Sequence, residues 1–333
     1  MHMESPKVFF IGATGYIGGS ILVAFVRGHP ELTYSALVRN PKDIQAIANL
    51  NVRAIQGSTS DIPLIEKETS EHDIVVNCAN ADDLRLAEAV INGLTTRSSN
   101  PMKKGSRKPI YIHTSGTGVV KDRPTGAFQN GKIYDDYKEE DIRTIDPKQP
   151  HRNVDLLIFE AGKKGLIDTF IVAPSTIYGT GRGPVRNISQ QVNGMIRIAV
   201  KNKQVLRVGA GTNVWDNVHI NDLMDLYLRV LDLALLNIDI PGSPYERFFW
   251  GSAHTHIWGE VARDLAMLMY KRGLVDRDEV RSVNVEDEPD LIGVATNSRT
   301  IANRSLRMLG WMPTGKSLAD MLEEEIDLTL SQL

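Results

Sequence analysis

Hydrophobic and polar positions form two alternating patterns along the first half of the chain. Short, almost continuous apolar runs are separated by stretches in which apolar residues recur at helical spacing. Strands this apolar are buried on both faces, which predicts a parallel sheet covered by helices. The predicted strands are Val8–Ile11, Thr33–Val38, Val52–Gln56, Asp73–Cys78, Pro109–Thr114 and Thr169–Ala173. The predicted helices are one between Gly18 and Gly28, Lys42–Leu50, Ile62–Thr69, Ala81–Arg97 and Arg152–Lys164.

The pattern changes in the second half. Ser98–Lys108 predicts a surface connection, and the glycine- and charge-rich stretch Ser115–Pro150 predicts a long loop. The later predicted helices are Ile188–Lys201, Asp222–Leu236, Trp258–Arg272 and Leu318–Leu330. We therefore expect a doubly wound α/β domain over residues 1–180, to which parts of 205–255 return, and a smaller, mainly helical cap over 181–333. A substrate cleft is expected between them, at the carboxyl ends of the strands.

Composition narrows the class of protein. The chain has 333 residues, ordinary apolar content and a formal net charge of −3, which predict no affinity for nucleic acid or membranes. No apolar stretch approaches the roughly 20 residues that span a bilayer, and the first residues lack a signal-peptide core. The single cysteine excludes an intrachain disulfide and suits a reducing compartment. We expect a cytoplasmic protein.

Three closely spaced glycines follow the first strand and open the first helix. Such glycines let the backbone turn tightly and approach a pyrophosphate, while the helix N-terminus offers unpaired N–H groups and a positive dipole end. The segment therefore predicts a dinucleotide site. The contacts expected from it are Gly12, Thr14, Gly15, Tyr16, Ile17 and Gly18.

Six segments in order along the chain resemble motifs of the extended short-chain dehydrogenase/reductase superfamily, of the epimerase and dehydratase type. They are the glycines at three-residue steps, Gly57–Asp61, Asn77–Ala79, Pro174–Gly179, Val218–Leu223 and Leu309–Pro313. The resemblance covers most of the chain and implies a Rossmann-type nucleotide domain. It also implies that Asp61 touches the adenine and that Tyr178 lines the site near the nicotinamide. Further cofactor contacts implied by it are Asn77, Cys78, Ala79, Pro174 and Ser175.

The end of the second predicted strand bears on the choice of cofactor. A carboxylate there would bind the ribose hydroxyls of NAD and repel the 2′-phosphate of NADP. This strand instead leads into Arg39 and Lys42, with no carboxylate at its tip. Arg39 offers a planar, permanently charged fork to a phosphate, and Lys42 adds a point charge. NADP(H) is therefore favoured over NAD(H), although Arg39 is also compatible with a solvated loop residue.

The catalytic positions depart from the family pattern. The resemblance implies a Ser or Thr that holds the substrate oxygen, and Ser115 occupies that position. It also implies a Tyr four residues before a Lys, on the helix that feeds the sixth strand. Tyr134 and Lys138 have that spacing, but prolines separate them from the helix. By register, His151 stands for the tyrosine and Asp155 for the lysine.

This replacement changes the chemistry. A carboxylate raises rather than lowers the pKa of a neighbouring phenol, so Asp155 cannot replace the lysine. His151 exchanges protons near neutral pH, and Asp155, one helical turn away, is expected to orient it. Alternatively, His151 is only a histidine at a helix start and Asp155 a surface carboxylate. A further alternative is that the loop folds back and delivers Tyr134 to the site.

Several other residues are weaker candidates. Thr117 and Arg182 are expected to contact substrate, together with Tyr178, although surface charge explains the arginine equally well. His254 and His256 have a spacing seen in metal sites, but without a third ligand they predict a segment that caps the following helix, and no metal site is expected.

Three functions remain open from the sequence. The first is an NADP(H)-dependent oxidoreductase acting on a carbonyl or alcohol of a small organic molecule, with Ser115 holding the substrate oxygen and His151 or Tyr134 donating the proton. The second is a non-redox lyase, isomerase or cyclase in the same cleft. The third is a non-catalytic NADP-sensing regulatory protein. The resemblance also implies a homodimer, in which the predicted helix Ala81–Arg97 would be one of the two contacting helices.

Overall fold

The central feature of the fold is a seven-stranded parallel sheet. The structure is a computed structural model that describes residues 5–100, 107–128, 131–236 and 242–333. The strands, in spatial order, are β11 (Phe248–Gly251), β7 (Asp168–Pro174), β5 (Ile110–Thr114), β4 (Ile74–Asn77), β1 (Lys7–Ile11), β2 (Thr33–Val38) and β3 (Arg53–Gln56). The six strands predicted from apolar runs are all present, and β11 adds a seventh. The predicted α/β class with a doubly wound parallel sheet is confirmed.

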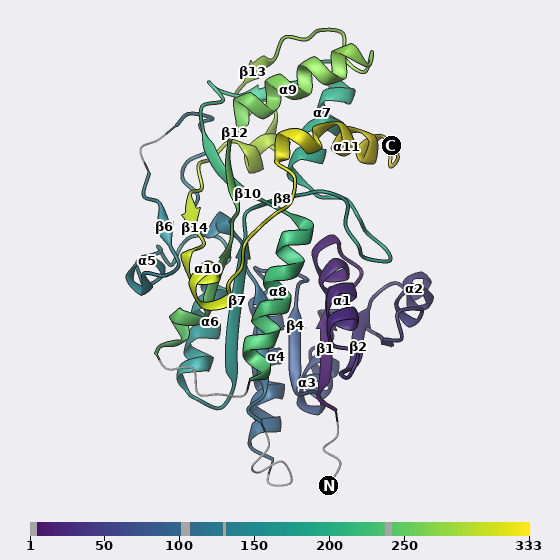
Figure 1. Cartoon of the computed structure of the whole chain (residues 1–333), viewed down its shortest axis with the longest axis vertical. Helices are drawn as coiled ribbons and strands as arrows, with labels where there is room; N and C mark the ends of the chain where they lie inside the picture. The colour runs from purple at the N-terminus through teal and green to yellow at the C-terminus, as the bar shows by residue number, and fades with distance from the viewer. Residues whose placement is uncertain (1–4, 101–106, 129–130, 237–241) are drawn as a thin grey trace.

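Helices cover both faces of this sheet (Figure 1). On one face α1 (Tyr16–Gly28) packs against α8 (Ile220–Leu235). On the other, α4 (Leu84–Ser98) lies between α3 (Ile62–Glu71) and α6 (Arg152–Lys163). A short 3₁₀ turn, η1 (Pro41–Asp43), leads into α2 (Ile44–Ala48) beside β3.

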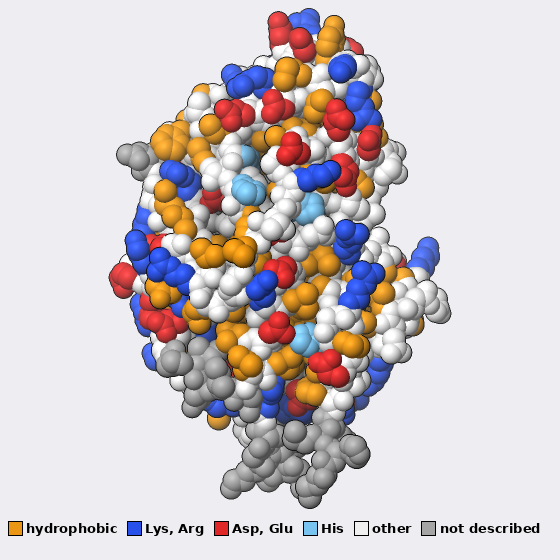
Figure 2. Space-filling view, in the orientation of Figure 1, with side chains coloured by type: hydrophobic (Ala, Val, Ile, Leu, Met, Phe, Trp, Pro, Cys, Tyr) orange, Lys and Arg blue, Asp and Glu red, His pale blue; other side chains and the backbone are white. Residues whose placement is uncertain are grey.

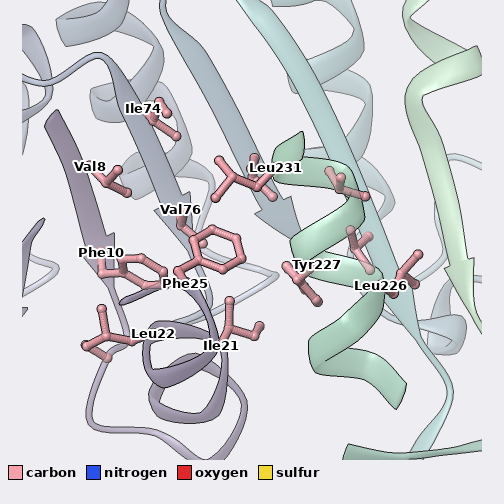
Figure 3. Close-up of a cluster of buried hydrophobic side chains, with 14 of the residues drawn as sticks. Val8, Phe10, Ile21, Leu22, Phe25, Ile74, Val76, Leu226, Tyr227 and Leu231 are labelled. Atoms are coloured by element: carbon pink, nitrogen blue, oxygen red, sulfur yellow. The ribbon is translucent and has the colours of Figure 1, made fainter. Parts of the chain in front are cut away.

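The core on the α1 and α8 face is built from the apolar runs that predicted the strands. Figure 3 shows these side chains interdigitating between the sheet and the two helices. Burying them removes a large apolar area from water, which stabilises the folded chain by roughly 25 cal/mol per Å² buried. The labelled members are Val8, Phe10, Ile21, Leu22, Phe25, Ile74, Val76, Leu226, Tyr227 and Leu231.

The remaining described elements form three smaller sheets and further helices. The minor sheets are β12 (His254–Ile257) with β10 (Val214–His219) and β8 (Thr176–Tyr178), β13 (Arg281–Val283) with β9 (Leu206–Val208), and β14 (Thr300–Ile301) with β6 (Tyr134–Asp135). The other helices are α5 (Glu139–Arg143), α7 (Gln191–Asn202), α9 (Trp258–Lys271), α10 (Asn303–Leu309) and α11 (Leu318–Leu330). The other 3₁₀ turns are η3 (Thr117–Val120), η4 (Pro244–Arg247) and η5 (Pro289–Val294).

Two local expectations are corrected. The predicted loop Ser115–Pro150 holds short elements, among them η3, β6 and α5. The predicted capping segment His254–His256 is instead the edge strand β12, and α9 begins after it without a side-chain cap. Part of the predicted connection Ser98–Lys108 lies outside the described residues.

One face of the surface carries both signs of charge. Figure 2 shows acidic and basic side chains interspersed over the face drawn. Among the described helices, none is both long enough and apolar enough to cross a bilayer.

Candidate active site

The glycine loop between β1 and α1 is packed so tightly that it excludes side chains. Gly12 has φ +94°, and a Cβ there would lie 2.7 Å from the carbonyl carbon of Cys78 at the end of β4. A Cβ on Gly18 would lie 2.3 Å from the carbonyl oxygen of Gly12. Only glycine tolerates such a turn and such close approaches.

The N-terminus of α1 is left open to an anion. Gly15 is its N-cap, no side chain caps it, and no acidic residue stands in its first turn. The first N–H groups and the positive dipole end therefore remain available. The backbone cradle and this helix end fit the pyrophosphate of a dinucleotide.

The ends of the neighbouring strands surround this cradle with buried polar groups. The Asn77 side-chain oxygen accepts from the Ala79 N–H at 3.1 Å, and the Asn77 amide nitrogen donates to the Tyr111 hydroxyl at 3.3 Å. Thr114 donates to the Cys78 sulfur at 3.1 Å. Burial raises the pKa of the Cys78 thiol to about 12, so at neutral pH it is not a nucleophile.

The predicted adenosine contacts lie at the ends of β2 and β3. Arg39 and Lys42 are exposed, and the Asn40 side chain accepts from the Lys42 N–H and so orders the turn between them. Asp61 caps α3 by accepting from the Leu64 N–H at 3.3 Å.

Ser115 and Asp155 meet beyond the end of β5. The Ser115 hydroxyl donates to Oδ2 of Asp155 at 3.1 Å, and both side chains are buried. Burial raises the pKa of Asp155 to about 7, although the Ser115 hydrogen bond and the Arg152 charge oppose that rise. Oδ1 of Asp155 is also buried and has no hydrogen-bond partner among the described residues. The pair is therefore a serine backed by a carboxyl that titrates near neutrality.

His151, the residue before α6, is held by Asp82 rather than by Asp155. Oδ1 of Asp82 accepts from the His151 backbone N–H at 2.8 Å and lies 2.9 Å from Nδ1 of the ring. A Cβ on Gly116 or Gly118 would lie 3.4 or 3.3 Å from Nε2, so the ring lies close to these two glycines. The expected His151–Asp155 pair is thus corrected to His151–Asp82.

The backbone explains this correction. His151 has φ +66°, a left-handed conformation that costs a non-glycine residue on the order of 1 kcal/mol. It therefore stands outside the regular helix, where side chains one turn apart would face each other. Asp155 is fully buried and turned toward Ser115, so it is not the surface carboxylate of the alternative interpretation either.

His113 is a further buried polar group at this edge. It lies in β5, Nδ1 is 3.4 Å from the Tyr111 hydroxyl, and Nε2 has no hydrogen-bond partner among the described residues. Burial, assisted by nearby His151, lowers the pKa of His113 to about 3, so the ring is neutral. Sequence reasoning missed two residues near the carboxyl edge of the sheet. His113 lies in β5, and Asp82 follows β4.

Two sequence-family models match consecutive segments of this chain. The family described as NAD(P)H-binding matches residues 12–145, which hold the glycine loop and Ser115. The NAD-dependent epimerase/dehydratase family matches residues 149–237, which hold His151 and Asp155. Together the two matches span residues 12–237, an NAD(P)H-binding segment followed by an NAD-dependent epimerase/dehydratase segment.

Several curated relatives and solved structures are similar to this chain over most of its length. Oxidase ucsJ from Acremonium sp. is 28% identical over 96% of both chains. dTDP-glucose 4,6-dehydratase from Mycobacterium tuberculosis is 23% identical over 68% of this chain and 69% of that protein. The same fold occurs in DesIV, a dTDP-glucose 4,6-dehydratase from Streptomyces venezuelae with NAD and TYD bound, with a TM-score of 0.67 at 18% identity over 98% of this chain and 97% of that one. It also occurs in UDP-glucuronic acid 4-epimerase from Bacillus cereus, with a TM-score of 0.66 at 16% identity over 98% and 100%.

Tyr134, which the sequence offers as an alternative proton donor, is held in β6. Its N–H donates to the Arg299 carbonyl at 3.0 Å, and Lys132 lies 4.6 Å from the centre of its ring. Within the described parts of the chain, no hydrogen bond joins Tyr134 to Ser115 or His151.

Four further predicted residues make hydrogen bonds to groups that are distant in the sequence. The Tyr178 hydroxyl donates to the Lys316 carbonyl at 2.7 Å, and the Tyr16 hydroxyl donates to the Gly179 carbonyl at 2.7 Å. The Arg182 N–H donates to the Ser20 hydroxyl, and the Ser175 hydroxyl donates to the Gly251 carbonyl, both at 3.0 Å.

The other predicted contacts lie along the cradle and at η3. Thr117 is buried, and its carbonyl accepts from the Ser298 hydroxyl at 2.7 Å. Ile17 packs against the α1 and α8 core, Thr14 is half-buried in the glycine loop, and Pro174 ends β7. Among the described residues, no group of three or more His, Cys, Asp or Glu is placed to hold a metal.

Proposed function

We propose that the chain is an NADP(H)-dependent oxidoreductase that acts on a carbonyl or alcohol of a small organic molecule. The observation that carries the proposal is the placement of two acid–base pairs, Ser115–Asp155 and His151–Asp82, near one another at the sheet edge that holds the glycine loop. A relative named an oxidase, which matches 96% of the chain, supports the same reaction class.

The chain's own groups fit NADP(H). The backbone of Gly12, Gly15 and Gly18 and the first turn of α1 would hold the pyrophosphate, and Arg39 and Lys42 would pair with the 2′-phosphate. When bound, the nicotinamide would supply or accept a hydride.

Ser115 holds the substrate oxygen, and Asp155 sets the direction of its hydrogen bond. When Asp155 is ionised, the serine proton points to the carboxylate, so the serine oxygen can accept from a substrate hydroxyl. When Asp155 is protonated, it can donate to the serine, which then donates to a substrate carbonyl. Because the pKa of Asp155 lies at about 7, both arrangements are populated near neutral pH.

His151 moves the proton. The Asp82 carboxylate accepts a hydrogen bond from Nδ1–H of His151 and so fixes the tautomer of the ring. Nε2 is then the ring nitrogen that exchanges a proton with the substrate oxygen. In the reducing direction Nε2 gives a proton to that oxygen, and in the oxidising direction Nε2 takes it back.

The test begins with binding. Calorimetric titration should show NADPH and NADP⁺ binding more tightly than NADH and NAD⁺. Arg39→Ala should weaken NADPH binding tenfold or more, which is about 1.4 kcal/mol, and leave NADH unchanged. Failure of all four nucleotides to bind would contradict the cofactor assignment.

Turnover is tested next, as NADPH consumption over a panel of aldehydes and ketones. Ser115→Ala and His151→Phe should each lower kcat/KM by two orders of magnitude or more, since each removes a group from the transition state. Thr125→Ala, in an exposed loop, is the matched control. Cofactor binding without NADPH consumption on any substrate would overturn the redox proposal.

One observation favours a second candidate, a non-redox lyase or isomerase. Asp155 places a carboxyl where the superfamily's lysine is expected, and relatives of this chain include proteins named dehydratases. Product formed at full rate without nicotinamide would favour this candidate, whereas strict dependence on NADPH would exclude it.

A further inference from the structure

One face of the three-stranded sheet carries a row of polar side chains. Thr176 of β8 and Asn217 of β10 are paired in parallel register, so their side chains point to the same face. The Asn217 amide nitrogen lies 3.0 Å from Nδ1 of His256 in β12. The row thus crosses the whole sheet from β8 to β12.

Each of the three side chains has one buried atom without a protein partner. These atoms are the Asn217 oxygen, Nε2 of His256 and the Thr176 hydroxyl, and none has a hydrogen-bond partner among the described residues. Asn217 and Thr176 are no more than 1% exposed. Buried polar groups are almost always paired, so three orphaned atoms in one row indicate a missing partner.

The chemistry of that partner follows from the hydrogen bond that is made. With the Asn217 amide nitrogen as donor, Nδ1 of His256 is the acceptor, so the ring proton is on Nε2. Burial lowers the pKa of His256 to about 3, so the ring carries no charge. The pair therefore presents an uncharged donor, the Nε2 proton, beside an acceptor, the Asn217 oxygen.

The row starts beside the candidate reactive centre. Thr176 follows Pro174 by two residues, and the Pro174 carbonyl lies 3.8 Å from where a Cβ on Gly116 would be. The Thr117 carbonyl also accepts a hydrogen bond from the Ser298 hydroxyl, and Ser298 forms an isolated β-bridge with Trp215 of β10. A molecule with its reacting oxygen on Ser115 would therefore extend toward Asn217 and His256.

We propose that Asn217 and His256 form a substrate-recognition site for an uncharged group that both donates and accepts a hydrogen bond, such as a primary amide or a lactam. This proposal rests on the proposed function in placing the group on the substrate. A phosphate or carboxylate is disfavoured, because it would meet the Asn217 oxygen and gain no positive charge from His256.

Histidine-selective ¹⁵N NMR of the full chain with NADPH tests the site, with acetamide and acetate as probes. Free protein should show His256 as the Nε2–H tautomer. Acetamide should shift this resonance saturably, and acetate should not. Asn217→Ser should weaken acetamide binding tenfold or more, and the exposed His254→Phe should leave it unchanged.

Other results would overturn the site. They are the Nδ1–H tautomer of His256, no saturable shift with acetamide, or equal binding of acetate. The His256 tautomer and the response to acetamide and acetate are measured on the wild-type chain, so they test the site even if Asn217→Ser does not fold. Because the NMR readout needs no turnover, acetamide binding in a chain without redox activity would contradict the proposed function alone. Redox turnover with no response to acetamide would contradict this site alone.

Discussion

Replacing Asp155 with asparagine should change how stability depends on pH. The carboxyl is fully buried, and burial raises its pKa from an ordinary 3.8 to about 7. A carboxyl whose folded pKa is raised binds its proton more tightly in the folded chain than in the unfolded one. The contribution of Asp155 to folding stability is therefore greatest below pH 3.8 and is lost as the pH rises through about 7.

The magnitude follows from the two pKa values. Each pKa unit corresponds to about 1.36 kcal/mol, so ionising Asp155 in place costs about 4 kcal/mol of unfolding free energy above pH 7. Roughly 2 kcal/mol of that cost appears between about pH 5.5 and about pH 8. Asparagine cannot ionise, so Asp155→Asn should lack this loss, whatever constant cost its buried amide adds.

Urea-induced unfolding of both proteins at the two pH values measures the effect. The free energy of the variant minus that of the wild type should rise by about 2 kcal/mol from the lower to the higher pH. Asp290→Asn, at an exposed position in η5, should show no such rise. If the Asp155→Asn difference is the same at both pH values, the raised pKa and the proton role proposed for this carboxyl are refuted.

Three other substitutions test separate parts of the site. Asp82→Asn should lower kcat tenfold or more with unchanged NADPH affinity, because His151 loses the partner that fixes its tautomer; an unchanged kcat would argue against that role. Gly18→Ala should abolish NADPH binding in calorimetry, because its Cβ would meet the Gly12 carbonyl at 2.3 Å, whereas Gly194→Ala, which meets nothing within 4 Å, should bind normally. Tyr134→Phe should leave kcat within twofold of wild type, and a large loss would restore it as a candidate proton donor.

The cofactor half of the site was predictable because neighbouring residues build it. The spacing of Gly12, Gly15 and Gly18 implies a tight turn into a helix, and the packing at Gly12 and Gly18 has that form. The long apolar runs likewise predicted six strands of the sheet. β11 was missed because Phe248–Gly251 is short and contains a glycine, and β6 and β14 are two-residue strands with no periodic signal.

The reactive half could be predicted only in part, because its members come from two strand ends and the start of a helix. Register placed Ser115, His151 and Asp155 in the same neighbourhood, and the structure brings Ser115 and Asp155 into contact. Asp82 had no signal, since the sequence placed it in the first turn of the predicted helix Ala81–Arg97, where a carboxylate is common on any surface. The left-handed backbone of His151 also had no signal, yet it decides which carboxylate the imidazole contacts.

In the proposed mechanism the two carboxylates have different tasks because their surroundings differ. Asp82 is largely exposed, so water supports its charge while it accepts two hydrogen bonds from His151. Asp155 is withdrawn from water, which favours the protonated form and lets it return a proton to Ser115. A lysine at position 155 would stay protonated and charged near neutral pH unless its pKa fell by several units, so it would not exchange a proton with Ser115 there. The replacement is therefore consistent with a site in which the proton passes between histidine, serine and aspartate, and in which no tyrosine needs activation. Such a site pays in stability for the buried carboxyl and the strained His151, as expected where backbone strain and a shifted pKa occur together at a functional centre.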